Sequence, residues 1–158
     1  MSTGFFRASA GACVTDGTGR VLAFRRCTET GLRHSWQMPQ GGIESAETPH
    51  AAMLRELREE TGLLPSDVQV LDEHPEWLVY ELAARYRSPK VGWGQAQKWF
   101  LLRAKPEAEV IPDGKEFDAF EWVTAEELLK RAVDFRIPIY RKVLAAFGLL
   151  ALRHPGGT

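Results

Sequence analysis

Short apolar runs bounded by turn residues predict a sheet as the framework of this chain. Residues 8–14 are small and apolar, and residues 21–24 form a second apolar run after a turn signal at residues 16–19. The two runs are therefore expected to form a hairpin. Further strands are predicted where β-branched, aromatic and leucine residues gather, at residues 68–71, 76–82 and 95–103.

A helix is predicted between the strand at residues 21–24 and the strand at residues 68–71. Thr48 can accept hydrogen bonds as the N-cap, and Pro49 suits the first helical position. No glycine or proline follows until Gly62, which is typical of the residue that ends a helix. The side expected to pack on the sheet carries Ala51, Met53, Leu54 and Leu57.

Two shorter helices are predicted near the C-terminus. Thr124 and Glu127 have the spacing of a capping box, and Pro138 can begin the last helix. That helix has an apolar stripe formed by Ile139, Val143, Leu144 and Phe147. Strands interspersed with helices predict the α/β class, a mixed central sheet between helices.

Composition and charge place the chain among ordinary globular proteins. Its 158 residues suit one domain, expected at residues 4–150, with flexible ends at residues 1–3 and 154–158. A net charge of −1 argues against bulk polyelectrolyte binding. No signal peptide or membrane span is expected, and Cys13 and Cys27 are interpreted as reduced thiols of a cytoplasmic protein.

Three carboxylates in the first predicted helix have unusual spacing. Glu56, Glu59 and Glu60 fall at positions i, i+3 and i+4, so they share one helix face. Like charges at that spacing repel each other unless a cation lies between them. Clustered carboxylate oxygens are ligands for hard divalent ions, so Mg²⁺ or Mn²⁺ is the expected cofactor. The alternative interpretation is an amphipathic helix with a solvated acidic face.

The stretch from Gly41 to Leu63 resembles the Nudix box of the Nudix hydrolases. Every fixed position of that box is filled, by Gly41, Glu47, Arg55, Glu56, Leu57, Glu59, Glu60, Gly62 and Leu63. A motif of this kind still needs a matching structural context. The resemblance implies a Nudix-type α/β/α sandwich in which a loop–helix–loop carries the catalytic residues.

Three further strings narrow the resemblance to one branch of the family. They are WQMPQGGI at residues 36–43, GQAQKWFL at residues 94–101 and EFDAFEWV at residues 116–123. They resemble the branch of bacterial RNA 5′-pyrophosphohydrolases and dinucleoside polyphosphate hydrolases. One position departs from the branch, which usually has glycine where this chain has Ala46. The site is expected to tolerate Ala46 if that residue need not adopt positive φ.

The resemblance also implies roles for individual residues. Glu56, Glu59, Glu60 and Glu116 are the expected catalytic and metal-binding carboxylates, and Gly41 is a further metal-site residue. Either Glu56 or Glu116 is expected to orient or deprotonate the attacking water. Glu116 could instead be a surface carboxylate at a strand start. Glu47 and Arg55 are interpreted as structural support, with Arg55 bound to Glu47 or to a ligand glutamate.

Substrate contacts are expected from cationic, amide and aromatic side chains outside the box. The candidates are Arg7, Arg25, Gln40, Lys98 and Phe135. Lys98 lies among apolar residues, so a phosphate or a box carboxylate is expected as its partner. Phe135 is proposed to stack on a base, although an aromatic residue before a helix could also belong to the core. Residues 83–94 could form either a solvated basic loop or a channel wall for a polyanion.

The expected activity is hydrolysis of a nucleoside polyphosphate linkage with the help of a divalent metal. The substrate implied by the resemblance is the 5′-triphosphate end of RNA, diadenosine polyphosphates, or both. Alternatives are a pyrophosphatase for nucleotide sugars or damaged nucleotides, and a nucleotide-binding module without catalytic activity. No membrane or obligate protein partner is indicated, and the protein is expected to be a monomer or homodimer.

Overall fold

A computed structural model describes residues 4–27 and 35–151 of the chain. The ends expected to be flexible, residues 1–3 and 154–158, lie outside this range, and so does most of the polar loop after β2. No helix within the described ranges has the length and apolar character that crossing a membrane requires.

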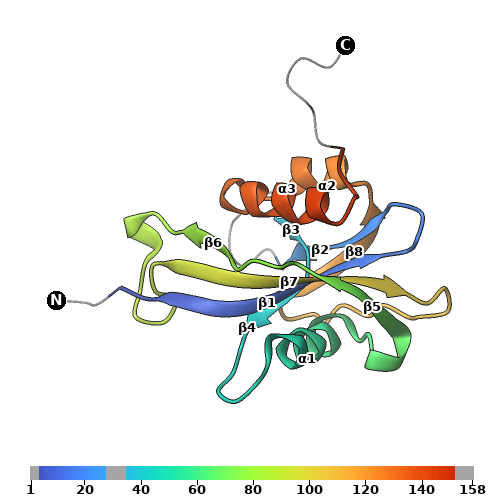
Figure 1. Cartoon of the computed structure of the whole chain (residues 1–158), viewed down its shortest axis with the longest axis horizontal. Helices are drawn as coiled ribbons and strands as arrows, with labels where there is room; N and C mark the ends of the chain where they lie inside the picture. Colours follow the sequence, from blue (N-terminus) through green and yellow to red (C-terminus); the bar gives the residue numbers. More distant parts are fainter. Residues whose placement is uncertain (1–3, 28–34, 152–158) are drawn as a thin grey trace, which may run out of the picture.

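The described residues form one eight-stranded mixed sheet (Figure 1). Its main strand order is β3-β2-β1-β7-β5, while β4 pairs with β1, β6 with β7 and β8 with β2. The β1–β7 pair is parallel and the other pairs are antiparallel. The strands are β1 (Phe6–Thr15), β2 (Val21–Arg26), β3 (Trp36–Gln37), β4 (Gln40–Gly42), β5 (Val68–Glu73), β6 (Leu78–Glu81), β7 (Gly94–Ala104) and β8 (Phe117–Val123).

Helices cover both faces of this sheet. Helix α1 (Pro49–Thr61) packs on one face, and α2 (Ala125–Arg131) and α3 (Ile137–Ala146) lie together on the other (Figure 1). Short 3₁₀ turns are present at Pro65–Asp67, Ala84–Tyr86 and Asp134–Arg136. The sandwich of a mixed sheet between helices, predicted from the sequence, is confirmed.

The predicted ends of α1 are also confirmed. The Ala51 backbone N–H donates to Thr48 Oγ1 at 3.1 Å, and Pro49 is the first helical residue. Gly62 adopts φ +75° and its N–H donates to the Arg58 carbonyl at 3.0 Å. The prediction for the packed side was wrong at one position. Ala52 is buried against the sheet, whereas Ala51 is exposed.

The central strand β1 organises the sheet around β4 and the loop that leads into α1. It pairs with β4 on one side, with Ala10 opposite Gly41, and with β7 on the other, with Arg7 opposite Gln95. Since α1 follows β4 after a short loop, the same pairing brings the helix back over β1. The box residues are therefore held by the most extensively paired strands of the sheet.

Candidate active site

Arg55 connects the loop before α1 to the helix itself. Its Nε and Nη2 donate to the two oxygens of Glu47, each at 2.8 Å, and Nη2 also donates to the Gly42 carbonyl at 2.9 Å. Its Nη1 donates to Glu56 Oε1 at 2.8 Å and to Glu59 Oε2 at 3.3 Å. The support role expected for Glu47 and Arg55 matches these contacts, which include both kinds of partner that were expected.

This network controls the charge of its members. The hydrogen bond to Glu47 raises the pKa of Arg55, so the guanidinium stays charged. The same bond lowers the pKa of Glu47 to about 2. Burial raises the pKa of Glu56, and the Arg55 cation opposes that shift. A bidentate arginine of this kind fixes carboxylates in place as well as neutralising them.

Glu60 is the most buried carboxylate of the box, with 3% of its surface exposed. The connection between β7 and β8 runs past the end of α1, where the Asp113 N–H donates to the Glu60 carbonyl at 3.2 Å. Glu116 follows at the end of this connection, and its N–H donates to Asp113 Oδ1 at 2.9 Å. The chain thus brings Glu116 to Glu60 although the two are distant in sequence.

The electrostatics of Glu60 indicate a missing positive charge. Burial, followed by the negative charges of Glu116 and Glu56, raises its pKa to about 10. Its Oε2 is buried and has no hydrogen-bond partner among the residues that the structure describes. A buried polar atom without a partner is costly and rare in folded proteins. The arrangement therefore fits a cation that would accept this oxygen as a ligand.

Gly41 contributes space to the same cluster. A Cβ atom built at Gly41 would collide with the Glu56 carboxylate, so glycine leaves this carboxylate room beside β4. Its carbonyl and the carboxylates of Glu56, Glu60 and Glu116 form the set that could hold a divalent ion. In the described part of the chain, no three His, Cys, Asp or Glu side chains already lie in a metal-binding arrangement. Glu59 instead contacts Arg55.

Ala46 adopts φ +69°, the only positive φ of a non-glycine residue in the described ranges. The tolerance expected at this position depended on an ordinary φ, and that condition is not met. The surrounding turn is closed by Glu47 N–H donating to the Glu44 carbonyl at 3.0 Å and by Glu44 N–H donating to Glu47 Oε1 at 2.8 Å. These bonds hold Ala46 in the left-handed region.

A buried chain of amides lies on the other side of β4. The Trp99 Nε1–H donates to Gln97 Oε1 at 3.1 Å, and Gln97 Nε2 donates to Gln95 Oε1 at 2.8 Å and to Gln40 Oε1 at 3.3 Å. The Ser9 hydroxyl donates to the same Gln95 oxygen at 3.1 Å. The predicted contact residue Gln40 is therefore held in a defined orientation.

Aromatic and cationic side chains surround the outer end of this amide chain. The rings of Tyr80 and Phe135 lie 5.3 Å apart, and the Arg136 guanidinium lies 4.8 Å from the Phe135 ring centre. Burial raises the pKa of the Tyr80 phenol, while the positive charges of Arg136, Arg7 and Arg26 act to lower it. Three positive charges therefore act on the Tyr80 phenol.

Comparison with known proteins identifies the family. A model of the NUDIX domain matches residues 5–143 of the chain. The chain belongs to the Nudix family. It is 41% identical to an RNA pyrophosphohydrolase of Shewanella sediminis over 154 residues, which cover 93% of this chain and 87% of that relative. An RNA pyrophosphohydrolase of Aeromonas hydrophila is 40% identical over 158 residues, covering 95% and 88%.

A solved structure supports the fold of this Nudix chain. The Caenorhabditis elegans Ap4A hydrolase binary complex superposes with a TM-score of 0.69 at 20% identity, covering 90% of this chain and 98% of that one. At this level of identity the similarity shows the shared fold alone.

Two of the expected substrate residues of this Nudix protein have other partners in the structure. Arg25 Nε lies 2.8 Å from Asp118 Oδ1 on the exposed surface. Lys98 Nζ lies 3.8 Å from Glu73 Oε1 on β5, so the expectation of a box carboxylate as its partner was wrong. Arg7 lies beside Gly42, where an added Cβ would meet its guanidinium. Of the other three expected substrate residues, Arg7 lies beside β4, Gln40 belongs to β4, and Phe135 contacts Tyr80.

The contact residues predicted from the sequence do not include Tyr80, Arg26 or Arg136, whose rings or charges lie at this face. The register between β2 and β8 shifts at Arg25 and Arg26, where Asp118 is the extra residue on β8, and no local sequence pattern predicts such a shift. The sequence did contain an indication for Tyr80. It lies in a predicted strand, where every second side chain points to the same face of the sheet.

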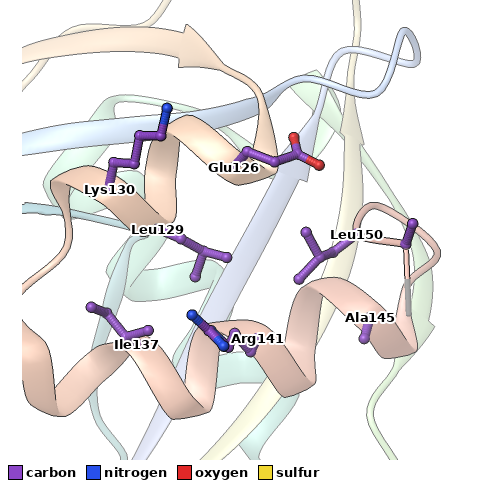
Figure 2. A pocket seen from close by; sticks show the side chains of 8 residues that line it. Glu126, Leu129, Lys130, Ile137, Arg141, Ala145 and Leu150 are labelled. Carbon is purple, nitrogen blue, oxygen red and sulfur yellow. The ribbon is translucent and has the colours of Figure 1, made fainter. Parts of the chain in front are cut away.

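A separate groove lies between α2 and α3 (Figure 2). Its volume is about 750 Å³, and its lining includes Glu126, Leu129, Lys130, Ile137, Arg141 and Ala145. None of the box residues lines it, so the candidate active site is not this groove.

Proposed function

We propose that this protein is a pyrophosphohydrolase that uses a divalent metal to cleave a phosphoric anhydride bond of the 5′-triphosphate end of RNA. The observation that carries the proposal is Glu60, a buried carboxylate with an unpartnered oxygen beside Glu56 and Glu116. Both bacterial relatives are named RNA pyrophosphohydrolase, which supports RNA as the proposed substrate.

The proposed metal is Mg²⁺ or Mn²⁺, because the donor set consists of oxygens. Glu56, Glu59, Glu60, Glu116 and the Gly41 carbonyl would hold it. For Glu59 this requires its carboxylate to leave Arg55, to which its bond is the longest of that network. When bound, the ion supplies positive charge that neutralises phosphate oxygens and polarises phosphorus.

Glu116 is the proposed general base. Arg55 already donates a 2.8 Å hydrogen bond to Glu56. This bond favours the charged form of the Glu56 carboxylate but also occupies one of its oxygens. Glu116, by contrast, is exposed and is not among the carboxylates that Arg55 binds. It can therefore accept the proton of the water that attacks phosphorus, as the anhydride oxygen leaves with the bonding electron pair.

The face around Tyr80 is proposed to bind the 5′ nucleotides. Tyr80 and Phe135 offer aromatic surface for a base, and Arg7, Arg26 and Arg136 offer charge for phosphates. The same face could accept one adenosine of a diadenosine polyphosphate, which is the second candidate substrate. Arg25 and Lys98 remain candidates for contacts with more distant phosphates.

The active unit is proposed to be one domain at residues 4–150, acting as a monomer or homodimer in the cytoplasm. Two core clusters on the two faces of one sheet, one containing Ala10 of β1 and the other Leu144 of α3, support the single domain. The cytoplasm is proposed because cellular 5′-triphosphorylated RNA is made there.

The decisive experiment compares kcat/KM for five substrates in the presence of Mg²⁺. These are triphosphorylated RNA, diadenosine tetraphosphate, NADH, ADP-ribose and 8-oxo-dGTP. Triphosphorylated RNA is expected to be the best substrate, with diadenosine tetraphosphate second. A clear preference for NADH, ADP-ribose or 8-oxo-dGTP would overturn the proposed substrate.

Variants of the same experiment test the residues. Glu59→Gln and Glu60→Gln should remove most of the activity, and EDTA should do the same. Glu116→Gln should lower kcat by ~10²–10⁴-fold with little change in KM. The charge-matched control is Glu126→Gln on α2, which should keep wild-type activity. Full turnover in EDTA would refute the metal site, and an unchanged kcat in Glu116→Gln would refute the base.

A further inference from the structure

Exposed aromatic side chains gather at one end of the sheet, beyond the candidate active site. Phe5 precedes β1, and Tyr86 and Trp93 belong to the connection between β6 and β7. Their exposed fractions are 43%, 58% and 40%. Figure 1 places this connection beside the start of β1, at the end of the sheet where the N-terminus lies. These three residues are called the distal aromatic surface.

The surface is built from fixed parts. The Trp93 N–H donates to the Phe5 carbonyl at 2.8 Å, and the Leu82 N–H donates to the Trp93 carbonyl at 2.6 Å. A Cβ at Gly4 would collide with the Trp93 ring, and one at Gly92 would collide with the Phe5 carbonyl. The backbone thus packs against the rings of Phe5 and Trp93, so these two side chains are held in position while remaining exposed.

An arginine accompanies two of these aromatic residues. The Arg85 guanidinium lies 4.7 Å from the Tyr86 ring centre, and that of Arg87 lies 4.9 Å from the Trp93 ring centre. Arg87 is anchored by its Nε, which donates to the Leu82 carbonyl at 2.8 Å. The surface therefore presents planar cations together with rings.

The local charge has one sign. Residues 82–106 contain no aspartate or glutamate, although the whole chain has 21 acidic residues. The acid beside the surface is Glu81, whose Oε2 lies 3.7 Å from Arg87 Nη2 with most of its side chain exposed. That long and exposed pair is weak enough for a phosphate to compete with it. With its positive charges and exposed aromatic rings, the surface is complementary to a polyanion that carries unpaired bases.

The distal aromatic surface continues the candidate substrate face. Arg7 is opposite Gln95 in the β1–β7 pair, and Tyr80 is opposite Gln95 in the β6–β7 pair. Phe5 lies two residues before Arg7 and Trp93 lies two residues before Gln95, a separation of about 7 Å in extended chain. A chain that leaves the face around Tyr80 and Arg7 in this direction meets the rings next.

We propose that the distal aromatic surface binds single-stranded RNA immediately 3′ of the nucleotides held in the active site. The inference rests on the proposed function and names the part of the substrate that the catalytic residues do not reach. Aromatic platforms interleaved with cations bind single strands because every base has a face that can stack, whatever the sequence. The surface would favour longer, unpaired 5′ ends over short nucleotides.

The test compares a triphosphorylated dinucleotide with a triphosphorylated unstructured ten-nucleotide RNA. Wild-type protein should hydrolyse the longer RNA with a higher kcat/KM, mainly through a lower KM. Trp93→Ala and Tyr86→Ala should each reduce that advantage by about 10-fold, and Arg85→Gln should make it less sensitive to salt. All three variants should hydrolyse the dinucleotide and diadenosine tetraphosphate as the wild type does, which also shows that they fold.

Matched controls carry the same substitutions elsewhere. Trp77→Ala removes another exposed tryptophan, and Arg20→Gln removes a charge from the β1–β2 hairpin; both should keep the preference for longer RNA. An equal kcat/KM for both RNA lengths, or a preference that survives in Trp93→Ala and Tyr86→Ala, would overturn the inference.

Two other outcomes are distinguishable. If sedimentation shows a dimer that Trp93→Ala dissociates, the surface is a protein interface and the inference is wrong. If no triphosphorylated substrate of either length is hydrolysed, the proposed function itself fails.

Discussion

Replacing Ala46 by glycine should stabilise this protein, although it removes a side-chain atom. Ala46 has φ +69° in the loop that feeds α1, and its side chain is exposed, so no packing is lost. A left-handed conformation costs an L-residue ~1–2 kcal/mol, which glycine avoids. Glycine also adds about 0.4–1 kcal/mol of unfolded-state entropy that folding must overcome. The net gain in unfolding free energy should be about 0.5–1 kcal/mol.

Urea unfolding followed by circular dichroism measures this change, and the melting temperature should rise by about 1–4 °C. The matched control is Ala51→Gly, which makes the same change at an exposed helical position of α1. That control should destabilise the protein by ~0.5–1 kcal/mol because glycine disfavours helix. The two variants differ only in the backbone conformation at the substituted residue.

The result that refutes the reasoning is destabilisation of Ala46→Gly by as much as Ala51→Gly. Such a result would mean that the loop relaxes to an ordinary φ in solution. The turn bonds between Glu44 and Glu47 would then not hold Ala46 in the left-handed region. Activity provides a second readout, because the same turn fixes Glu47 and, through Arg55, the Glu56 carboxylate.

Three other substitutions test separate parts of the structure. Glu47→Gln should destabilise the protein at pH 7. Since the folded pKa of Glu47 is lowered to about 2, its contribution is present above its ordinary value near 4.5 and is lost as pH falls toward 2, so wild type and variant should converge in acid unfolding curves. Tyr140→Phe should cost ~1–3 kcal/mol of unfolding free energy, because the buried Met38 N–H donates to this hydroxyl at 3.0 Å; no change would show that water replaces it. Phe135→Ala should raise KM for triphosphorylated RNA with little change in melting temperature, because this half-buried ring contacts Tyr80 and Arg136; a large drop in melting temperature with unchanged KM would assign it to the core.

The catalytic helix could be predicted from sequence because its determinants are local. The Thr48 cap, the Pro49 start and the Gly62 end each act within four residues, and the spacing of the glutamates follows from the helical repeat. The strand positions were predicted for the same reason, since alternation and turn residues are also local. What the repeat could not show is that Glu60 is buried and Glu59 is not.

The proposed substrate face could not be predicted to the same degree, because pairing between distant strands creates it. Tyr80 meets Arg7 only through Gln95, which pairs with both β6 and β1. The partner of Lys98 came from β5, and that of Arg25 from β8. In each case the sequence identified a side chain that needed a partner, while the sheet topology decided which partner it received.

The burial of Glu60 favours one of the two interpretations of the acidic helix. A solvated acidic face would leave all three carboxylates exposed, where their repulsion is weak and screened by salt. Here one carboxylate is buried with an unpartnered oxygen, and Glu116 arrives beside it from a distant strand connection. Folding alone gains nothing from that arrangement, since an apolar residue would fill the space more favourably. The unfavourable electrostatics are therefore best explained by a positive ligand, which is the basis for assigning this cluster to metal-assisted hydrolysis.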